Sequence, residues 1–322
     1  MDLSVTLHGQ THDLVLKNPV LTASGTFGCG LEFAPYGDLK SLGGIVVKGI
    51  SLKPRDGNAC PRIVETTGGM LNAVGLQNDG VEDFCIAKLP LLPWRETAVI
   101  VNIYASSVEE FAALAARLNG EEGVAALEVN VSCPNVSCGG VLFGQDPALA
   151  AAVTAAVRKA APSKHVMVKL SPNVTDIAGI AKSVEGAGAD SISCINTLLG
   201  MGLDLRSRRP ILVNVVGGLS GPAIKPVALR CVWQTALAVR IPVVGVGGIV
   251  NSVDALEFIL AGAHAVQVGT GNFMRPNCAF TLAANLPAVC AEYGVKSLEA
   301  LRNSNFENAP VQGVCVDLSE RS

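Results

Sequence analysis

One segment of the chain holds a thiol and several amides close together. Residues 128–135 read Glu-Val-Asn-Val-Ser-Cys-Pro-Asn, which brings Asn130, Cys133 and Asn135 within one short stretch. Amides hydrogen-bond planar heterocycles, and a cysteine thiolate accepts a proton. An isolated cysteine is more often a small packing residue, but these neighbours favour chemistry. We therefore take Cys133 as the candidate catalytic residue.

The elements that must position this segment are short apolar runs. The run before Cys133 predicts a buried strand that Pro134 ends, so we expect Cys133 in the loop beyond it. Eight such runs recur, at 20–24, 44–48, 98–103, 125–131, 165–170, 191–195, 242–246 and 265–268. Alanine-rich helical patterns lie between them, at 108–118, 147–160, 174–187 and 253–260. This alternation predicts the α/β class and a single TIM (β/α)8 barrel.

Three further segments complete the predicted architecture. Residues 3–7 and 14–16 predict an N-terminal β-hairpin that closes the lower end of the barrel. The connections 51–92 and 198–240 are longer than ordinary βα loops, so we expect them over the C-terminal face. No linker or second domain stands out, and residues 1–322 are predicted to form one catalytic domain.

Polar residues recur where the apolar runs end. The carboxyl ends of the strands of a TIM barrel converge on one mouth, so we expect these residues to become neighbours: Ser24, Lys48, Asn102, Asn130, Lys169, Asn196 and Gly247. Taken singly, each is more often a satisfied loop residue than a ligand contact. Together they predict a polar site with two cations.

Glycine-rich turns follow the last two runs. They read Gly-Val-Gly-Gly-Ile at 245–249 and Gly-Thr-Gly at 269–271, and Asn251 or Ser252 is the expected N-cap of the next helix. Loops at this position of the fold commonly bind phosphate. A phosphate here and Lys169 deeper in the mouth suit FMN, because a cation stabilises the charge of a reduced flavin. Pyridoxal phosphate on Lys48 or Lys169, and plain phosphosugar chemistry, remain open.

Composition narrows the possible partners and the compartment. The net charge is −3 and hydrophobic residues make up 49%, so a nucleic acid partner is not expected and the core is large. No apolar stretch is long enough for a membrane span. Ten cysteines without a secretory leader predict reduced thiols and a cytoplasmic location. The histidines are scattered and no C-x-x-C occurs, so no metal or iron–sulfur site is expected in this chain.

Five motifs, taken in order, resemble one family. They are Gly-Ile-Val-Val-Lys-Gly at 44–49, Asn-Ala-Val-Gly-Leu-Gln-Asn at 72–78, Asn-Val-Ser-Cys-Pro-Asn at 130–135, Val-Lys-Leu-Ser-Pro at 168–172 and Asn-Thr at 196–197. The set resembles class 1 dihydroorotate dehydrogenases. The cysteine at position 133 makes the chain resemble class 1, since the membrane-associated class 2 enzymes have serine at this position and carry an N-terminal extension. The segment 139–147 resembles subgroup 1B.

The resemblance implies the oxidation of (S)-dihydroorotate to orotate in pyrimidine biosynthesis. It implies that Cys133 is the general base that removes the C5 proton while hydride passes from C6 to the flavin. It further implies contacts to substrate from Lys48, Asn72, Ala73, Val74, Gly75, Leu76, Asn130, Asn196 and Thr197. The FMN contacts that it implies are Ser24, Lys48, Gly49, Asn102, Asn130, Lys169, Ile195, Gly221, Gly247, Gly248, Gly269 and Thr270. Asn78 and Asn135 match motif positions for substrate contact or loop support.

Subgroup 1B also implies partners. Its members form a homodimer of this subunit with two subunits that carry FAD and a [2Fe–2S] cluster, and electrons pass to NAD⁺. Alternatives that the residues leave open are a 1A-type fumarate-reducing enzyme, an enzyme acting on dihydrouracil, and a non-oxidative barrel for phosphate ligands. The substrate carboxylate separates orotate chemistry from dihydrouracil chemistry, and Lys48 with the loop at Asn72 favours orotate.

Overall fold

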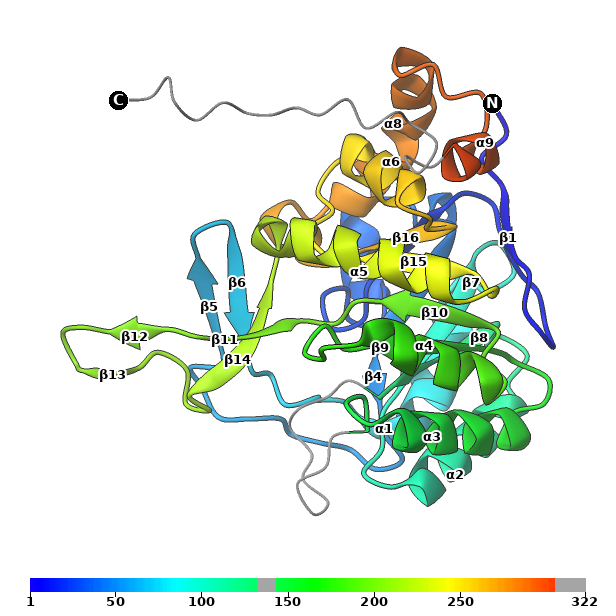
Figure 1. Ribbon diagram of the computed structural model, residues 1–322. Helices are drawn as coiled ribbons and strands as arrows, with labels where there is room; N and C mark the ends of the chain where they lie inside the picture. Colours follow the sequence, from blue (N-terminus) through cyan, green and yellow to red (C-terminus); the bar gives the residue numbers. More distant parts are fainter. Residues whose placement is uncertain (132–142, 305–322) are drawn as a thin grey trace, which may run out of the picture.

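Eight parallel strands form a closed barrel in the computed structural model, which describes residues 1–131 and 143–304 (Figure 1). Their order around the barrel is β10-β15-β16-β3-β4-β7-β8-β9. The strands are β3 (Val20–Thr22), β4 (Gly44–Ile50), β7 (Ala98–Ile103), β8 (Ala126–Asn130), β9 (His165–Leu170), β10 (Ser191–Cys194), β15 (Val243–Val246) and β16 (Ala265–Val268). The TIM barrel predicted from the sequence is confirmed, and each predicted run coincides with one of these strands.

The barrel interior is built in layers, because side chains two positions apart on a strand point to the same side. The lower layer is apolar and includes Ile100, Ala126, Met167 and Ala265. Two positions further along the same four strands the side chains are polar and buried: Asn102, Glu128, Lys169 and Gln267. The interior therefore changes from apolar to polar toward the carboxyl ends of the strands.

The N-terminal hairpin closes the lower end of the barrel. Strands β1 (Val5–Leu7) and β2 (Leu14–Leu16) pair antiparallel. Leu7, Leu14 and Leu16 belong to the same apolar cluster as the lower layer. Full burial of a leucine stabilises a fold by about 1.5–3 kcal/mol, so these three side chains hold the hairpin in place. The predicted hairpin is confirmed.

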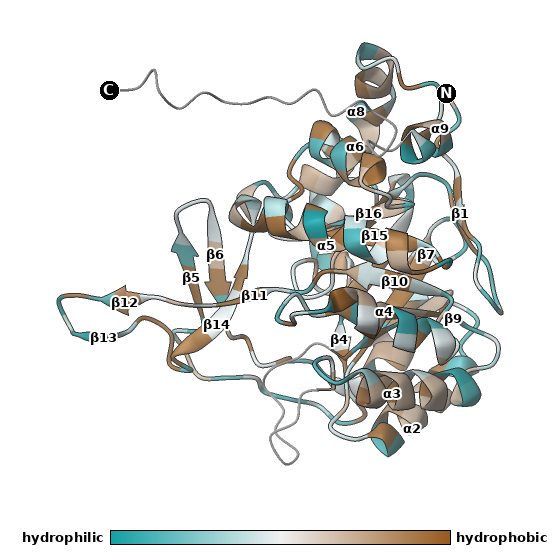
Figure 2. Ribbon diagram, viewed as in Figure 1, coloured by the Kyte–Doolittle hydropathy of each residue, from teal (hydrophilic) through white to brown (hydrophobic). Residues whose placement is uncertain are grey.

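Helices surround the barrel strands in Figure 1. They are α1 (Gly80–Asp83), α2 (Val108–Asn119), α3 (Pro147–Ala160), α4 (Ile177–Gly186), α5 (Lys225–Ala238), α6 (Ser252–Leu260), α7 (Gly271–Met274), α8 (Cys278–Glu292) and α9 (Leu298–Asn303). Figure 2 shows hydrophobic and hydrophilic residues on the same helices, as expected for helices with one buried face. The apolar faces of α2 and α3 pack on the strands through Phe111, Leu114 and Val153.

Side-chain caps determine where several helices begin. Asp146 accepts hydrogen bonds from the backbone N–H groups of Ala148 (2.7 Å) and Leu149 (3.0 Å), so α3 begins at residue 147 as predicted. The predicted start of α4 at residue 174 is three residues early, because the Asp176 side chain accepts from the Gly179 N–H at 2.9 Å and caps the helix there. Side-chain capping thus determines the first residue of a helix where the spacing of apolar residues does not.

The two long connections form one additional sheet beside the barrel (Figure 1). Its order is β11-β14-β6-β5, from β5 (Ile63–Thr66), β6 (Gly69–Asn72), β11 (Leu198–Met201) and β14 (Val216–Ser220). A small hairpin, β12 (Leu203–Asp204) with β13 (Arg209–Pro210), projects from it. Short helical turns η1 (Leu31–Tyr36), η2 (Leu39–Ser41), η3 (Phe84–Lys88), η4 (Leu89–Leu91) and η5 (Pro222–Ile224) occupy other connections. The pairing of β6 with β14 joins the connections 51–92 and 198–240, which the sequence analysis predicted as separate loops.

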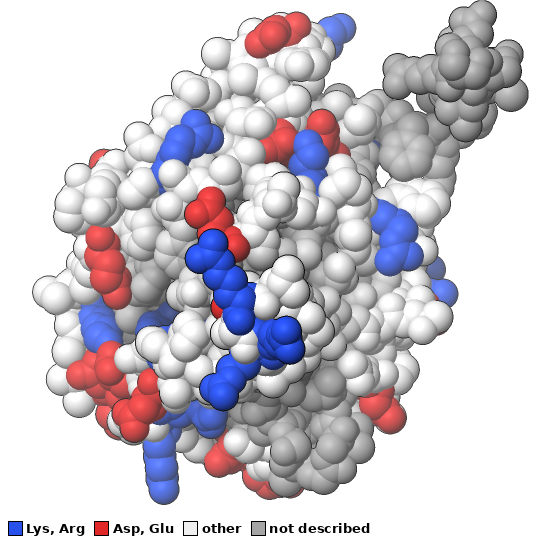
Figure 3. Space-filling model, turned by 90° about the vertical axis from the view of Figure 1, so that its left-hand side faces the viewer, with Lys and Arg blue, Asp and Glu red and all other residues white. Residues whose placement is uncertain are grey.

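The projecting hairpin lies on the face seen in Figure 3. That face is mostly uncharged, with a group of basic side chains near its centre and acidic side chains around it. Leu203 and Leu205 of the hairpin are 65% and 89% exposed.

Two properties of the described residues bear on the environment of the protein. The cysteines in residues 1–131 and 143–304 are all free, and most are buried. In the same part of the chain, the helices are each too short or too polar to cross a bilayer.

Candidate active site

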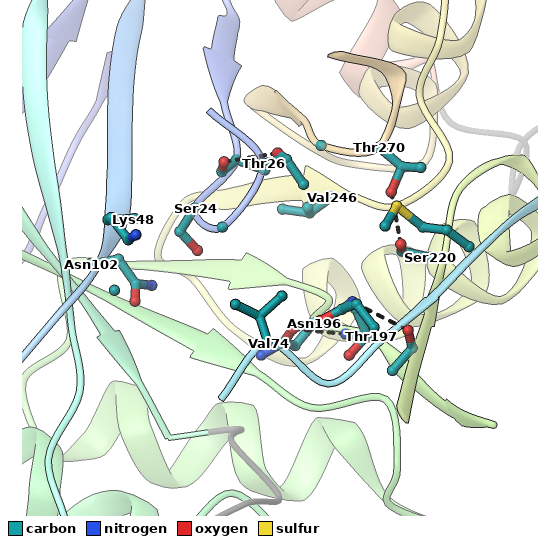
Figure 4. Close-up of a pocket in the computed structure, with 18 of the residues that line it drawn as sticks. Ser24, Thr26, Lys48, Val74, Asn102, Asn196, Thr197, Ser220, Val246 and Thr270 are labelled. Carbon is teal, nitrogen blue, oxygen red and sulfur yellow. Dashed lines mark hydrogen bonds between the residues drawn. The ribbon is translucent and has the colours of Figure 1, made fainter. Parts of the chain in front are cut away.

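A cavity of about 230 Å³ opens at the carboxyl ends of the barrel strands. Figure 4 shows Lys48, Ser24 and Asn102 on one side of it and Ser220 and Thr270 on the opposite side. The structure brings together nearly the whole predicted set along its walls: Ser24, Lys48, Gly49, Asn72, Val74, Gly75, Leu76, Asn102, Asn130, Lys169, Ile195, Asn196, Thr197, Gly221, Gly247, Gly248, Gly269 and Thr270. Strand ends that are far apart in sequence therefore form one site.

The wall residues do not include four of the predicted residues, namely Ala73, Asn78, Cys133 and Asn135. Cys133 and Asn135 lie outside the described residues, as do positions 139–142 of the segment 139–147. Ala73 is buried with Leu71 and Leu212 in a small apolar cluster of the additional sheet. Its backbone N–H donates to the Arg62 carbonyl at 2.8 Å, so Ala73 anchors the loop that carries its neighbours.

The floor of the cavity is the polar layer of the barrel. Strand register places Asn102 opposite Glu128 and Asn130 opposite Lys169. The Lys169 ammonium lies 3.3 Å from Ser24 Oγ and 3.9 Å from Glu128 Oε2, and its side chain is almost fully buried. Lys169 and Glu128 form a buried pair of opposite charges, of which only Lys169 lines the cavity.

Asn102 presents an unsatisfied acceptor to the floor. Its Nδ2 donates to Glu128 Oε2 at 2.7 Å, and its Oδ1 has no hydrogen-bond partner among the described residues although it is buried. A β-carbon added to Gly49 would lie 3.1 Å from this oxygen. Buried acceptors are rarely left unpaired, so this atom indicates a ligand that brings an N–H group to it.

Lys48 is the second cation of the site. It lies near the carboxyl end of β4, where its side chain points toward the cavity beside Ser24 (Figure 4). Its backbone N–H donates to the Gly28 carbonyl at 2.8 Å, which ties this part of the strand to the loop after β3. The ammonium group is therefore available to an anionic ligand on the open side of the cavity.

Five residues of the loop 72–78 line the cavity: Asn72, Val74, Gly75, Leu76 and Gln77. Gly75 and Leu76 are left-handed, with φ of 79° and 59°, and a β-carbon at Gly75 would lie 2.6 Å from the Asn58 side chain. Asn78, which is 2% exposed, donates to the Leu76 carbonyl at 2.9 Å and to Ser51 Oγ at 2.8 Å. Of its two predicted roles, loop support accounts for these contacts.

Asn196 and Thr197 follow β10 at the next side of the cavity. Asn196 Oδ1 accepts from the Thr197 N–H at 2.8 Å, and Asn173 Nδ2 donates to the Thr197 carbonyl at 3.0 Å. Within the additional sheet, Asn72 Nδ2 donates to the Gly218 carbonyl at 3.3 Å. Asn196 Nδ2 also donates to Asn130 Oδ1 at 3.4 Å, so these two amides hold each other in place beside the cavity.

Glycines form the far end of the cavity. Gly221, Gly247 and Gly248 have φ of 99°, 137° and 75°, a conformation that favours glycine. A β-carbon on Gly247 would lie 2.6 Å from Ala228, and one on Gly248 would lie 2.8 Å from Lys225. Close packing against α5 therefore requires glycine at these two positions, and a glycine turn that lines the cavity suits the backbone N–H contacts of a phosphate site.

The helix after the Gly247–Gly248 turn begins at a capping box. Asn251 Oδ1 accepts from the Asp254 N–H at 2.9 Å, and Asp254 Oδ2 accepts from the Asn251 N–H at 3.2 Å. The predicted N-cap at Asn251 is confirmed. Lys225 lies 2.6 Å from Asp254, and its pKa is raised by hydrogen bonds to Asp254 and Glu257 that outweigh its burial.

The sequence did not single out three members of the floor. Glu128 accepts hydrogen bonds from Ser193 Oγ at 2.8 Å and from Gln267 Nε2 at 2.6 Å, besides the one from Asn102. Each of the three is a polar residue inside a mainly apolar run. That interruption is the signal that would have found them.

Comparisons with known proteins agree with this geometry. A family model described as dihydroorotate dehydrogenase matches residues 6–289. A protein of Solidesulfovibrio magneticus named "Dihydroorotate dehydrogenase B (NAD(+)), catalytic subunit" is 64% identical over 94% of this chain and 98% of its own length. Proteins of the same name from Maridesulfovibrio salexigens and Trichlorobacter lovleyi are 61% and 58% identical, over 93% and 89% of this chain and 97% and 94% of their own lengths.

Proposed function

The chain belongs to the dihydroorotate dehydrogenase family, and from that premise we propose that it is the catalytic subunit of an NAD⁺-linked enzyme that oxidises dihydroorotate to orotate. The observation that carries the proposal is the polar layer at the mouth of the barrel. It joins two cations, several amides and a glycine-lined end in one cavity. A planar, hydrogen-bonding substrate and a phosphate-bearing flavin need this combination.

FMN is the proposed cofactor, and the residues present fit it. The unpaired Asn102 Oδ1 suits the N–H of a flavin pyrimidine ring. The Lys169 ammonium suits the acceptor oxygen and nitrogen of the same pyrimidine ring. The close backbone of Gly221, Gly247 and Gly248 suits the phosphate. When bound, FMN accepts the hydride that leaves C6 of the substrate.

The substrate is proposed to lie between Lys48 and the amide side chains. A cation stabilises the carboxylate of dihydroorotate through charge-assisted hydrogen bonds. Asn72, Asn130 and Asn196 offer both donors and acceptors to the ring amides. Asn196 donates to Asn130 Oδ1 at 3.4 Å and Asn72 donates to the Gly218 carbonyl at 3.3 Å, so these amides are held in place before substrate arrives, which reduces the entropy lost on binding.

Cys133 is proposed as the general base that takes the C5 proton. It follows Asn130, the last residue of β8, by three positions in the sequence. An unperturbed thiol has a pKa of about 8.5, so part of the population is thiolate at neutral pH. The proton moves from C5 to sulfur while the C6–H bond releases hydride.

Electrons are proposed to leave through a partner subunit with FAD and a [2Fe–2S] cluster, which reduces NAD⁺. The words "catalytic subunit" in the names of the relatives support a partner. We further propose a homodimer with two such subunits, one catalytic domain over residues 1–322, and a cytoplasmic location. The free cysteines of the described chain support a reducing compartment.

An anaerobic titration of the purified chain with dihydroorotate tests the proposal through the visible absorbance of the flavin. Bleaching in proportion to added dihydroorotate is the expected result. Dihydrouracil, which lacks the carboxylate, is the matched control and should bleach poorly. A colourless protein, or a yellow protein that only dihydrouracil bleaches, would refute the proposed activity.

A Lys48→Met variant extends the test to the carboxylate contact. Methionine keeps most of the length and apolar stem of lysine but removes the charge. We expect Lys48→Met to lose its preference for dihydroorotate over dihydrouracil. An unchanged preference would assign the carboxylate to another residue.

A further inference from the structure

A buried carboxylate lies below the cavity without lining it. Glu128 is fully buried in the middle of β8. Three donors surround it: Asn102 Nδ2 at 2.7 Å, Ser193 Oγ at 2.8 Å and Gln267 Nε2 at 2.6 Å. An ionised carboxylate only accepts hydrogen bonds, so this set of partners suits the charged form.

Glu128 determines which way the Asn102 amide faces. Because the carboxylate is an acceptor, it draws the Asn102 NH₂ group toward itself and leaves Oδ1 on the other side. That oxygen is the unpaired acceptor described above. A ligand that meets Asn102 must therefore offer a donor, and a ligand with only acceptors at this position is disfavoured.

Glu128 also acts on the charge of Lys169. The two side chains are 0% and 5% exposed and 3.9 Å apart, so solvent screens their attraction little. The carboxylate offsets part of the positive potential that Lys169 directs at the cavity. A bound group that gains electrons is stabilised by Lys169 and destabilised by Glu128.

We propose that Glu128 is a positioning residue that orients Asn102 as a hydrogen-bond acceptor for the flavin. By offsetting part of the positive potential of Lys169, Glu128 also lowers the flavin reduction potential. This inference rests on the proposed function, because it concerns FMN in the same cavity. Both effects begin at one carboxylate, but they depend on different properties of it. Orientation depends on an acceptor oxygen within reach of Asn102 Nδ2, which the side chain of glutamine also offers, and the potential depends on the charge.

Two variants separate these effects. Glu128→Gln keeps the size of the side chain and removes the charge, whereas Glu128→Asp keeps the charge and withdraws it by one methylene. The full chain loaded with FMN is equilibrated anaerobically with a reference dye to obtain the two-electron midpoint potential. The FMN dissociation constant is measured separately on the oxidised protein.

For Glu128→Gln we expect the reduced form of FMN to bind at least tenfold more tightly relative to the oxidised form, a rise of about 30 mV for a two-electron couple. For Glu128→Asp we expect at least fivefold weaker FMN binding with a potential close to that of the wild type. If Glu128→Gln fails to fold, the Asp variant still tests the orientation effect.

Asp190→Asn provides the control for a merely structural role. Asp190 is also a fully buried carboxylate, and it pairs with Arg158 at 2.7 Å and accepts from the Thr11 N–H, which precedes the N-terminal hairpin strand β2. Its loss should lower the melting temperature and leave the potential of bound FMN unchanged. An equal rise of the potential in Asp190→Asn would overturn the inference.

The outcomes distinguish this inference from the proposed function. A wild-type chain that binds no FMN overturns both. A wild-type chain that dihydroorotate bleaches, together with a Glu128→Gln variant of unchanged or lower potential, overturns only the role of Glu128. Unchanged FMN affinity in Glu128→Asp overturns the orientation effect.

Discussion

Gly218 offers a sharp test of the substrate side of the cavity. It lies in β14 opposite Asn72, and a β-carbon built on it would be 2.1 Å from Thr197 Oγ1 and 2.6 Å from Thr197 Cβ. Rotation of the threonine side chain cannot relieve the second contact, since Cβ does not move when χ1 rotates. We therefore expect Gly218→Ala to displace Thr197 from the substrate.

The size of the effect follows from the geometry. Restoring an ordinary 3.4 Å contact requires a movement of about 0.8 Å, and a misplacement of roughly 1 Å costs up to about 10²-fold in activity. A ligand group left buried without its hydrogen bond costs about 1–3 kcal/mol, or about 5- to 150-fold in affinity. The backbone at Gly218 has a conformation that alanine adopts, so the strain falls on Thr197.

Perturbation of the flavin spectrum by orotate gives the dissociation constant, and steady-state turnover gives KM. Gly120→Ala is the control, because a β-carbon there meets nothing within 4 Å. We expect a weaker orotate complex for Gly218→Ala and no change for Gly120→Ala, with equal flavin content in both. Orotate binding within twofold of the wild type in Gly218→Ala would refute the assigned contact of Thr197.

Three further predictions address the base, the cofactor and stability. Cys133→Ala should slow flavin reduction by dihydroorotate about 10²- to 10⁴-fold while FMN and orotate still bind; loss of FMN, or full turnover by Cys133→Ser, would contradict the role as base. Gly248→Ala should lose FMN, because at φ +75° its β-carbon would lie 2.8 Å from the first residue of α5. Gly294→Ala is the control, because its backbone at φ +65° gives a similar strain of roughly 1–2 kcal/mol but its β-carbon has open space around it. This variant should retain FMN. Equal FMN content in the two variants would argue against a phosphate site at Gly248. Burial lowers the pKa of His264 to about 4 from 6.5, so the unfolded chain binds this proton more readily than the folded one. The resulting stability is present above pH 6.5 and falls by roughly 3 kcal/mol as the pH drops toward 4; urea unfolding should show this loss, and His264→Gln should reduce it.

Local patterns in the sequence were enough to predict the barrel and much of the site. Strand positions follow from runs such as 98–103 and 165–170, because alternation of side chains is a property of a single segment. The ends of those runs also named Asn102 and Lys169 as members of one site. Motif resemblance added the loop 72–76, whose polar role no periodicity indicates.

Register and long-range pairing were decided only by the tertiary structure. Glu128 looks like an interruption of an apolar strand until neighbouring strands bring Asn102, Ser193 and Gln267 to it. The pairing of β6 with β14 depends on contacts between residues nearly 150 positions apart, such as Asn72 and Gly218, and no local signal encodes them. The types of the functional residues are written in the sequence, whereas their partners, and with them the charge and orientation of the site, exist only once the barrel closes.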